Sequence, residues 1–335
     1  MARLTQISSN ALQEKWKFKT TQELVMLALT GVLLVSFSIF LPGFFGVNNF
    51  LVLLNSIAIL GILSLGMGMI IMSRGIDLSE VAVMAGSWAI VLIFVDQGTS
   101  LPLAVFASLV FALAVGAFSG AVIAFIEAPA LFVTLAVSFV VYGIVFWMSP
   151  SLVHYVPQDA TALRFFGSGK LMGVPMPIII FMSCALVMHL FLSRSVPGRF
   201  LYAQGDNPWA ARLTGIPLRP LIVFEYMIVA LLAWIAGLVW VGTSGSVQMT
   251  VVQSPYIFDV ILVVILGGVS LVGGRGHTLS IVAGCLFIGT MLNALTIMNV
   301  SSDVQNIIRG SVLLLAIVID NFIHPRDEET ARQGD

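Results

Sequence analysis

The chain has 335 residues, of which 59% are hydrophobic and only 9% are charged, and its formal net charge is −1 at pH 7. This much apolar surface excludes an ordinary soluble domain, and long continuous apolar runs in place of short alternating segments exclude a transmembrane β-barrel. The composition therefore predicts an all-α polytopic membrane protein.

The apolar runs, taken in chain order, predict about ten membrane-spanning helices, because each needs ~20 mostly apolar residues. They cover residues 22–41, 51–72, 78–95, 102–125, 129–149, 175–193, 219–243, 257–274, 278–297 and 303–323. Residues 22–323 then form a single transmembrane domain between polar tails at 1–21 and 324–335. We expect no cleavable signal peptide, since the polar start contains no short apolar core that ends in a cleavage site.

Basic residues near the ends of the predicted spans indicate the orientation. When both tails are placed in the cytoplasm, most lysines and arginines lie on the inner side, and Arg164 and Lys170 lie in an outer loop. We therefore expect a multi-pass protein with both termini in the cytoplasm. The polar segment 194–219 then faces the cytoplasm too.

Segment 194–219 is the longest polar stretch between two long apolar runs, and it predicts a short amphipathic helix outside the membrane. Pro208 suits the first helical position, Asp206 and Asn207 suit the cap before it, and Gly215 suits the end. The apolar side chains at helical spacing are Trp209, Ala210, Leu213 and Ile216. Such a helix either docks in a groove of another protein or skims the membrane surface as an ordinary loop.

Motifs of enzymes are missing from the chain. It has no GxxxxGK[ST] run for binding ATP and no HExxH, and its histidines lack metal-ligand spacing. Cys184 and Cys285 both lie in apolar runs, which favours small core residues over a disulfide. We expect neither enzymatic activity nor a metal or cofactor in this chain.

Two polar, glycine-containing stretches interrupt the apolar pattern, and we name them the first break (73–80) and the second break (267–277). Broken helices at matching places in two halves are typical of transporters with internal repeats. Asp77 and Ser79 of the first break also suit a simple helix cap, which is the alternative to contact with a solute. The residues expected to shape the breaks near the path are Gly75, Asp77, Ser79, Gly267, Gly268, Gly273 and Gly274.

A polar group gathers near the outer ends of the last three predicted spans, and its members are Asp259, Asn293, Asn299, Asp303, Gln305, Asn306 and Arg309. The candidates for the solute path among them are Asp259, Asn293, Asn306 and Arg309. Amides together with an arginine–carboxylate set can hydrogen-bond the hydroxyls of a small polar solute. Surface solvation is the alternative for the group. For Arg309, which lies inside its span, the alternatives are a structural ion pair and a residue of the pathway.

Three motifs resemble those of the permease subunits of bacterial ABC importers for monosaccharides of the ribose, xylose and galactose type. GIDLS at 75–79 is similar to the signature GGIDLSVG, residues 198–216 to the cytoplasmic coupling segment, and ILGGVSLVGGRG at 265–276 to the loop LGGxSxxGGxG. The resemblance covers about residues 42–323. The chain departs from it at Arg74, Glu80 and Val81, where the signature has glycine, valine and glycine.

The resemblance implies a type II ABC importer-like fold with two inverted-repeat halves, in the bacterial inner membrane. It implies that the coupling segment docks into an ABC ATPase, and Trp209 and Arg212 are the side chains to test first. The implied coupling residues are Gly205, Asn207, Trp209, Ala210, Ala211, Arg212, Gly215 and Ile216.

The same resemblance implies the partners and the function. The partners are a cytoplasmic, tandem-domain ABC ATPase that binds ATP and Mg, a periplasmic solute-binding protein, a second permease that is identical or homologous, and a small polar solute, but no nucleic acid. The implied solute is a monosaccharide or related polyol. A nucleoside, a furanosyl signal molecule, a branched-chain amino acid and transport without an ATPase remain alternatives.

Overall fold

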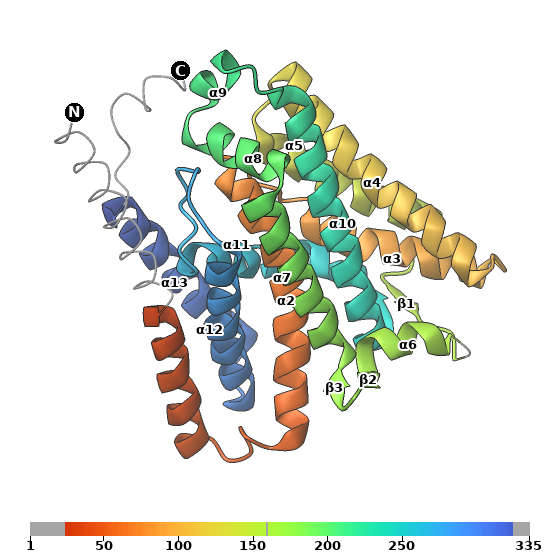
Figure 1. Ribbon diagram of the computed structural model, residues 1–335. Helices are drawn as coiled ribbons and strands as arrows, with labels where there is room; N and C mark the ends of the chain where they lie inside the picture. The colour runs from red at the N-terminus through yellow and green to blue at the C-terminus, as the bar shows by residue number, and fades with distance from the viewer. Residues whose placement is uncertain (1–23, 159, 324–335) are drawn as a thin grey trace.

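The computed structural model describes residues 24–158 and 160–323 (Figure 1), so the predicted tails at 1–21 and 324–335 lie outside the described residues. The part that is described is mostly helical. Helices long and apolar enough to cross a membrane are α2 (Val47–Met72), α4 (Leu101–Ile126), α5 (Ala130–Met148), α7 (Met176–Arg194), α10 (Leu218–Ser244) and α12 (Thr278–Ile297). These six helices have the length and composition expected of a polytopic membrane protein.

Further helices are shorter or more polar. They are the helical residues Leu24–Phe40, α3 (Glu80–Asp96), α6 (Thr161–Ser168), α8 (Val196–Asp206), α9 (Pro208–Leu213), α11 (Tyr256–Leu266), α13 (Ser302–Ile323) and the 3₁₀ helix η1 (Met249–Gln253). The predicted spans 22–41, 78–95, 257–274 and 303–323 overlap helices of this second group, so six of the ten predicted spans have a long apolar helix in the described chain.

The predicted span 257–274 is wrong in its length. Helix α11 ends at Leu266 after 11 residues, which at 1.5 Å per residue covers about half of a ~30 Å hydrocarbon core. The chain leaves the helix at Gly267, and Gly268 has a φ of +95° that is costly for residues with a side chain. Residues 267–277 then fold back as a loop in place of a last helical half.

Helix α2 lies at the centre of the structure and packs against α7, α10, α11 and α12. Nearly all its residues from Ile57 to Met72 are buried, as is expected for a helix that is apolar on every side. Helix α10 packs most extensively against α4, where Gly116 and Gly120 of α4 face the backbone of α10. A Cβ on Gly116 would lie 2.5 Å from the carbonyl oxygen of Tyr226, so this close approach requires glycine.

Two small antiparallel ladders lie at the end of the molecule that is opposite α8 and α9 (Figure 1). Strand β1 (Val153–Tyr155) pairs with β4 (Ser246–Gln248), with His154 opposite Val247. Strand β2 (Lys170–Leu171) pairs with β3 (Val174–Pro175). The sequence did not predict the first ladder, because its strands are three residues long and lie far apart in the chain.

Candidate functional site

Helices α8 and α9 form a corner at one end of the molecule (Figure 1), and we call it the α8–α9 corner. The predicted start of the second helix is confirmed: Pro208 is its first residue, and the Asn207 side chain accepts a hydrogen bond from the Ala210 N–H at 3.0 Å. Gly215, with a φ of +84°, follows the helix end. Helix α8 was missed, although Ser195 followed by Pro197 is a start signal, and the Ser195 hydroxyl oxygen accepts from the Gly198 N–H.

The outer face of α9 is apolar and open. Trp209 is 55% exposed and Leu213 is 87% exposed. The Arg212 guanidinium lies 5.5 Å from the centroid of the Trp209 ring, a cation–π contact that holds the two side chains together. Ala210 is exposed as well, and Ile216 is partly buried.

Two of the expected coupling residues lie on the inner side of the corner instead. Ala211 is buried, and so is Gly205. A Cβ on Gly205 would lie 1.8 Å from the Met72 carbonyl oxygen and 2.5 Å from the Gly274 nitrogen. These two residues therefore seat the corner on the membrane domain and do not present a surface to a partner.

The two breaks meet each other under this corner. The Gly274 N–H donates to the Met72 carbonyl oxygen at 2.8 Å, and the Tyr202 hydroxyl of α8 donates to the Gly276 carbonyl oxygen at 2.8 Å. Gly273 and Gly274 both have positive φ. Because an inverted repeat places equivalent segments at opposite ends, the first and second breaks are not the equivalent members of such a pair.

Asp77 forms a local turn in the first break with Ser79, the N-cap residue of α3. Its carboxylate accepts hydrogen bonds from the Ser79 N–H, at 2.8 Å, and from the Ser79 hydroxyl, directly before α3 begins. Asp77 is 4% exposed. The Asp77 carboxylate is therefore engaged by Ser79 at the start of α3, without a side-chain cap bond to the helix itself. Gly75 lies beside the Tyr226 hydroxyl at the same break.

A cavity of about 460 Å³ lies between α2, α10, α11 and α12, and we call it the central cavity. Of the predicted path residues, Asp259, Asn293 and Arg309 line it. Asn306 does not line it and is exposed on α13. The polar and aromatic residues that sequence reasoning missed are Asn55, Ser56, Trp240, Thr243, Ser244, Tyr256 and Thr296.

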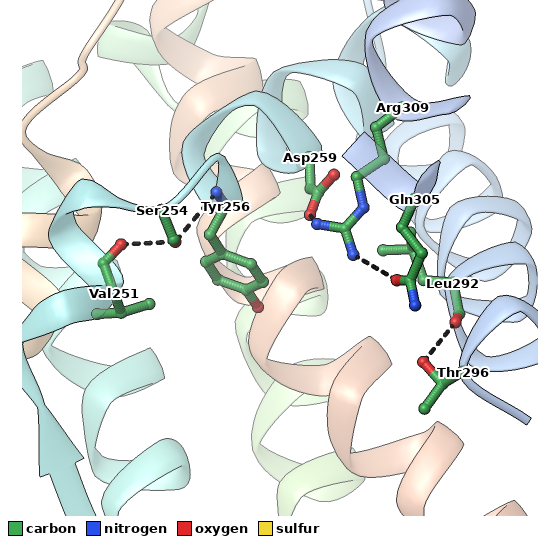
Figure 2. Close-up of polar contacts among 8 residues, drawn as sticks. All are labelled: Val251, Ser254, Tyr256, Asp259, Leu292, Thr296, Gln305 and Arg309. Atoms are coloured by element: carbon green, nitrogen blue, oxygen red, sulfur yellow. Dashed lines mark hydrogen bonds and ion pairs between the residues drawn. The ribbon is translucent and has the colours of Figure 1, made fainter. Parts of the chain in front are cut away.

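An ion pair lines one side of the central cavity, and its contacts are drawn in Figure 2. The Arg309 guanidinium lies 3.0 Å from the Asp259 carboxylate and also donates to the Gln305 side-chain oxygen at 3.2 Å. The Asp259 side chain is 2% exposed and that of Arg309 is 22% exposed. Tyr256 precedes Asp259 by about one helical turn, a spacing that could have identified it as a neighbour of the path.

A second polar pair lies beside the cavity. The side-chain amides of Asn49 and Asn293 exchange two hydrogen bonds of 3.0 Å, which join α2 to α12. The predicted residue Asn293 thus lines the cavity with its polar group already paired. The cavity combines hydroxyls, amides and aromatic rings with one internally neutralised ion pair.

Comparison of the sequence with known proteins identifies its family. A family model described as "Branched-chain amino acid transport system / permease component" matches residues 49–317. The ribose import permease protein RbsC of Escherichia coli strain K12 is 32% identical over 292 residues, which cover 87% of this chain and 91% of that protein. No solved structure matches the chain.

Two further relatives have the same breadth of match. The L-arabinose transport system permease protein AraH of Escherichia coli strain K12 is 31% identical over 301 residues, covering 89% of this chain and 90% of that protein. The fructose import permease protein FrcC of Rhizobium meliloti is 29% identical over 308 residues, covering 90% and 84%. The family is one of permease components, so this chain is not the catalytic subunit of a transport system. The chain is thus a multi-pass membrane protein that belongs to this permease family, and its expected resemblance to monosaccharide importer permeases is confirmed.

Proposed function

We propose that this chain forms the translocation path of an ATP-driven importer for a neutral monosaccharide or a related polyol. The observation that carries the proposal is the central cavity, in which the cation Arg309 is already neutralised by Asp259. A sugar needs many hydrogen-bonding groups and no net charge, and aromatic side chains such as Trp240 and Tyr256 suit the apolar face of a sugar ring. The named relatives, which are permeases for ribose, arabinose and fructose, support this solute class.

A branched-chain amino acid is the alternative that the family description raises. Its carboxylate would require an available cation in the path. Among the described residues that line the cavity, Arg309 is the cationic one, and its guanidinium is engaged by Asp259 and Gln305. This arrangement favours the neutral solute.

The proposed mechanism is alternating access driven by a separate ATPase. The α8–α9 corner would dock on a cytoplasmic, tandem-domain ABC ATPase that holds ATP and Mg, with Trp209, Arg212 and Leu213 outward. A periplasmic binding protein would deliver the solute, and a second, identical or homologous permease would complete the path. Both termini would lie in the cytoplasm, in agreement with the positive-inside rule.

Two inverted halves of a type II importer are part of the proposal. Each proposed half contains a long helix, a connection and a shorter helix. In the first half, the 26-residue α2 leads through the first break into the 17-residue α3. In the second half, the 27-residue α10 leads through β4 and η1 into the 11-residue α11. The first connection lies against α8, and the second pairs with β1. In Figure 1 these connections lie at opposite ends of the molecule, as inversion requires.

Reconstitution tests the proposed function. The chain is placed in proteoliposomes with its cognate ATPase and binding protein, and ATP-dependent uptake of labelled D-ribose, L-arabinose, D-fructose and L-leucine is compared. We expect uptake of at least one sugar and none of leucine. Uptake of leucine alone would establish the amino-acid alternative, and sugar uptake that continues with a disabled ATPase would contradict ATP coupling.

A further inference from the structure

Arg74 joins the end of α2 to the α8–α9 corner. It follows Ser73, the C-cap of α2, and its backbone has a φ of +70°, a left-handed conformation that favours glycine. From there the guanidinium reaches two backbone carbonyls: its Nε donates to Gly205 at 2.7 Å and its Nη2 donates to Asp206 at 2.7 Å.

These two carbonyls are the last of α8. The final carbonyls of a helix lack partners within it and form the negative end of the helix dipole. A planar arginine fork can bind both at once, which the ammonium of lysine cannot do with the same geometry. Arg74 therefore closes the C-terminus of α8 from a different part of the chain.

The same carbonyls lie directly before Asn207, which caps the start of α9. Arg74 therefore holds α8 at the residues where the chain turns into α9. The end of α2 is fixed to the corner by a second contact, from the Gln204 side-chain amide to the Ser73 carbonyl oxygen at 3.4 Å. The Met72 carbonyl oxygen is bonded by the Gly274 N–H of the second break.

Helix α2 connects this place with the central cavity. It is buried from Ile57 to Met72, and its residues Asn55 and Ile59 line the cavity. A packed helix moves as a rigid element. If a displacement of α9 shifts Met72, it therefore also shifts the residues of α2 that line the cavity.

We propose that Arg74 is a positioning residue for coupling, whose fork passes movement of α9 to α2 through the last two carbonyls of α8. The proposal rests on the proposed function, in which α9 docks on the ATPase. It assigns to Arg74 a role in transmitting motion and no contact with the solute.

The test compares R74G and R74K with the unaltered chain in the assembled importer. Glycine suits the φ of +70°, so R74G removes the fork without adding backbone strain. We expect R74G to keep basal ATP hydrolysis. The sugar-stimulated hydrolysis and the uptake should fall at least about tenfold, because R74G loses both charge-assisted hydrogen bonds of the fork. R74K should recover part of the loss. The control is Arg275→Gln, which removes an exposed cation from the second break and should change neither the stimulated hydrolysis nor the uptake.

A distance measurement on the permease alone separates this inference from the proposed function. Spin labels are placed at Val47→Cys on α2 and Leu213→Cys on α9, both strongly exposed, after Cys184 and Cys285 are replaced by serine. We expect a narrow distance distribution that broadens in R74G and narrows again in R74K. If sugar did not stimulate ATP hydrolysis by the unaltered complex, the proposed function would be contradicted. If sugar stimulated the R74G complex normally, or if the distance distribution of R74G equalled that of the unaltered permease, the role of Arg74 would be overturned.

Discussion

The guanidinium of Arg309 on α13 lies 3.0 Å from the carboxylate of Asp259 on α11 and joins two helices whose paired residues are 50 positions apart. The two sides of the pair are not equivalent. Asp259 is almost fully enclosed, while Arg309 keeps 22% of its side chain exposed and has Gln305 as a further partner. The pair supports the wall of the central cavity and leaves Arg309 without an uncompensated charge there.

Removing Arg309 should therefore destabilise the protein more than removing Asp259. Arg309→Met leaves a buried carboxylate without its cation, which costs about 3–5 kcal/mol. Asp259→Asn leaves a partly exposed guanidinium that still donates to Gln305, so its cost should be clearly smaller. The free energies of unfolding of both single variants and the double variant in detergent check this. Recovery of stability in the double variant is expected, and additive losses would show that the two groups are not coupled.

Features that depend on neighbouring residues in the chain could be predicted from sequence. The start of α9 followed from Pro208 and Asn207, because capping is a local interaction. The spacing of apolar side chains also identified the exposed Trp209 and Leu213. The six long apolar helices of the described chain were expected for the same reason.

Features that depend on long-range contacts could not be predicted. Gly205 was expected among the coupling residues, yet it lies under Met72 and Gly274, whose positions depend on the tertiary fold. On α13, Gln305 pairs with Arg309 whereas Asn306, one residue later, is exposed. One residue rotates a side chain by about 100° around a helix, so the sequence placed both residues in the polar group but did not select Gln305 over Asn306.

Gly205→Ala should prevent stable folding of the corner. Its Cβ would lie 1.8 Å from the Met72 carbonyl oxygen, and backbone atoms cannot move aside as a flexible side chain can. We expect a loss of several kcal/mol and little folded protein in the membrane, measured by thermal unfolding in detergent. Gly143→Ala is the matched control, because nothing lies within 4 Å of its Cβ and it sits within α5. That variant should be as stable as the parent or more so, by up to ~1 kcal/mol, and equal behaviour of the two alanine variants would contradict the close approach at Gly205.

The β1–β4 ladder should weaken in mild acid because of His154. Burial lowers the pKa of His154 from its ordinary 6.5, and the nearby Ser151 backbone and Asp96 oppose this only in part. As pH falls through 6.5 the unfolded chain takes up the proton before the folded chain does, so stability decreases until the lower folded pKa is reached. Above about pH 7.5 His154 is neutral in both states, so it contributes no pH dependence to the stability. Melting temperatures of the parent and His154→Gln between pH 5 and 8 isolate this residue from other titrating groups, and parallel curves would exclude it as the cause.

Leu213→Glu should weaken association with the ATPase while leaving the permease folded. Leu213 is 87% exposed and sits beside Trp209 on the outer face of α9, so a charge there costs the fold little but must be desolvated in an apolar interface. We expect a loss of ATPase in co-purification of about tenfold or more, which corresponds to roughly 1.4 kcal/mol. Met172→Glu is the control, since Met172 is 98% exposed and lies between β2 and β3 at the opposite end of the molecule. Co-purification should be normal with Met172→Glu. If both variants bound the ATPase equally well, α9 would not be the surface that docks on it.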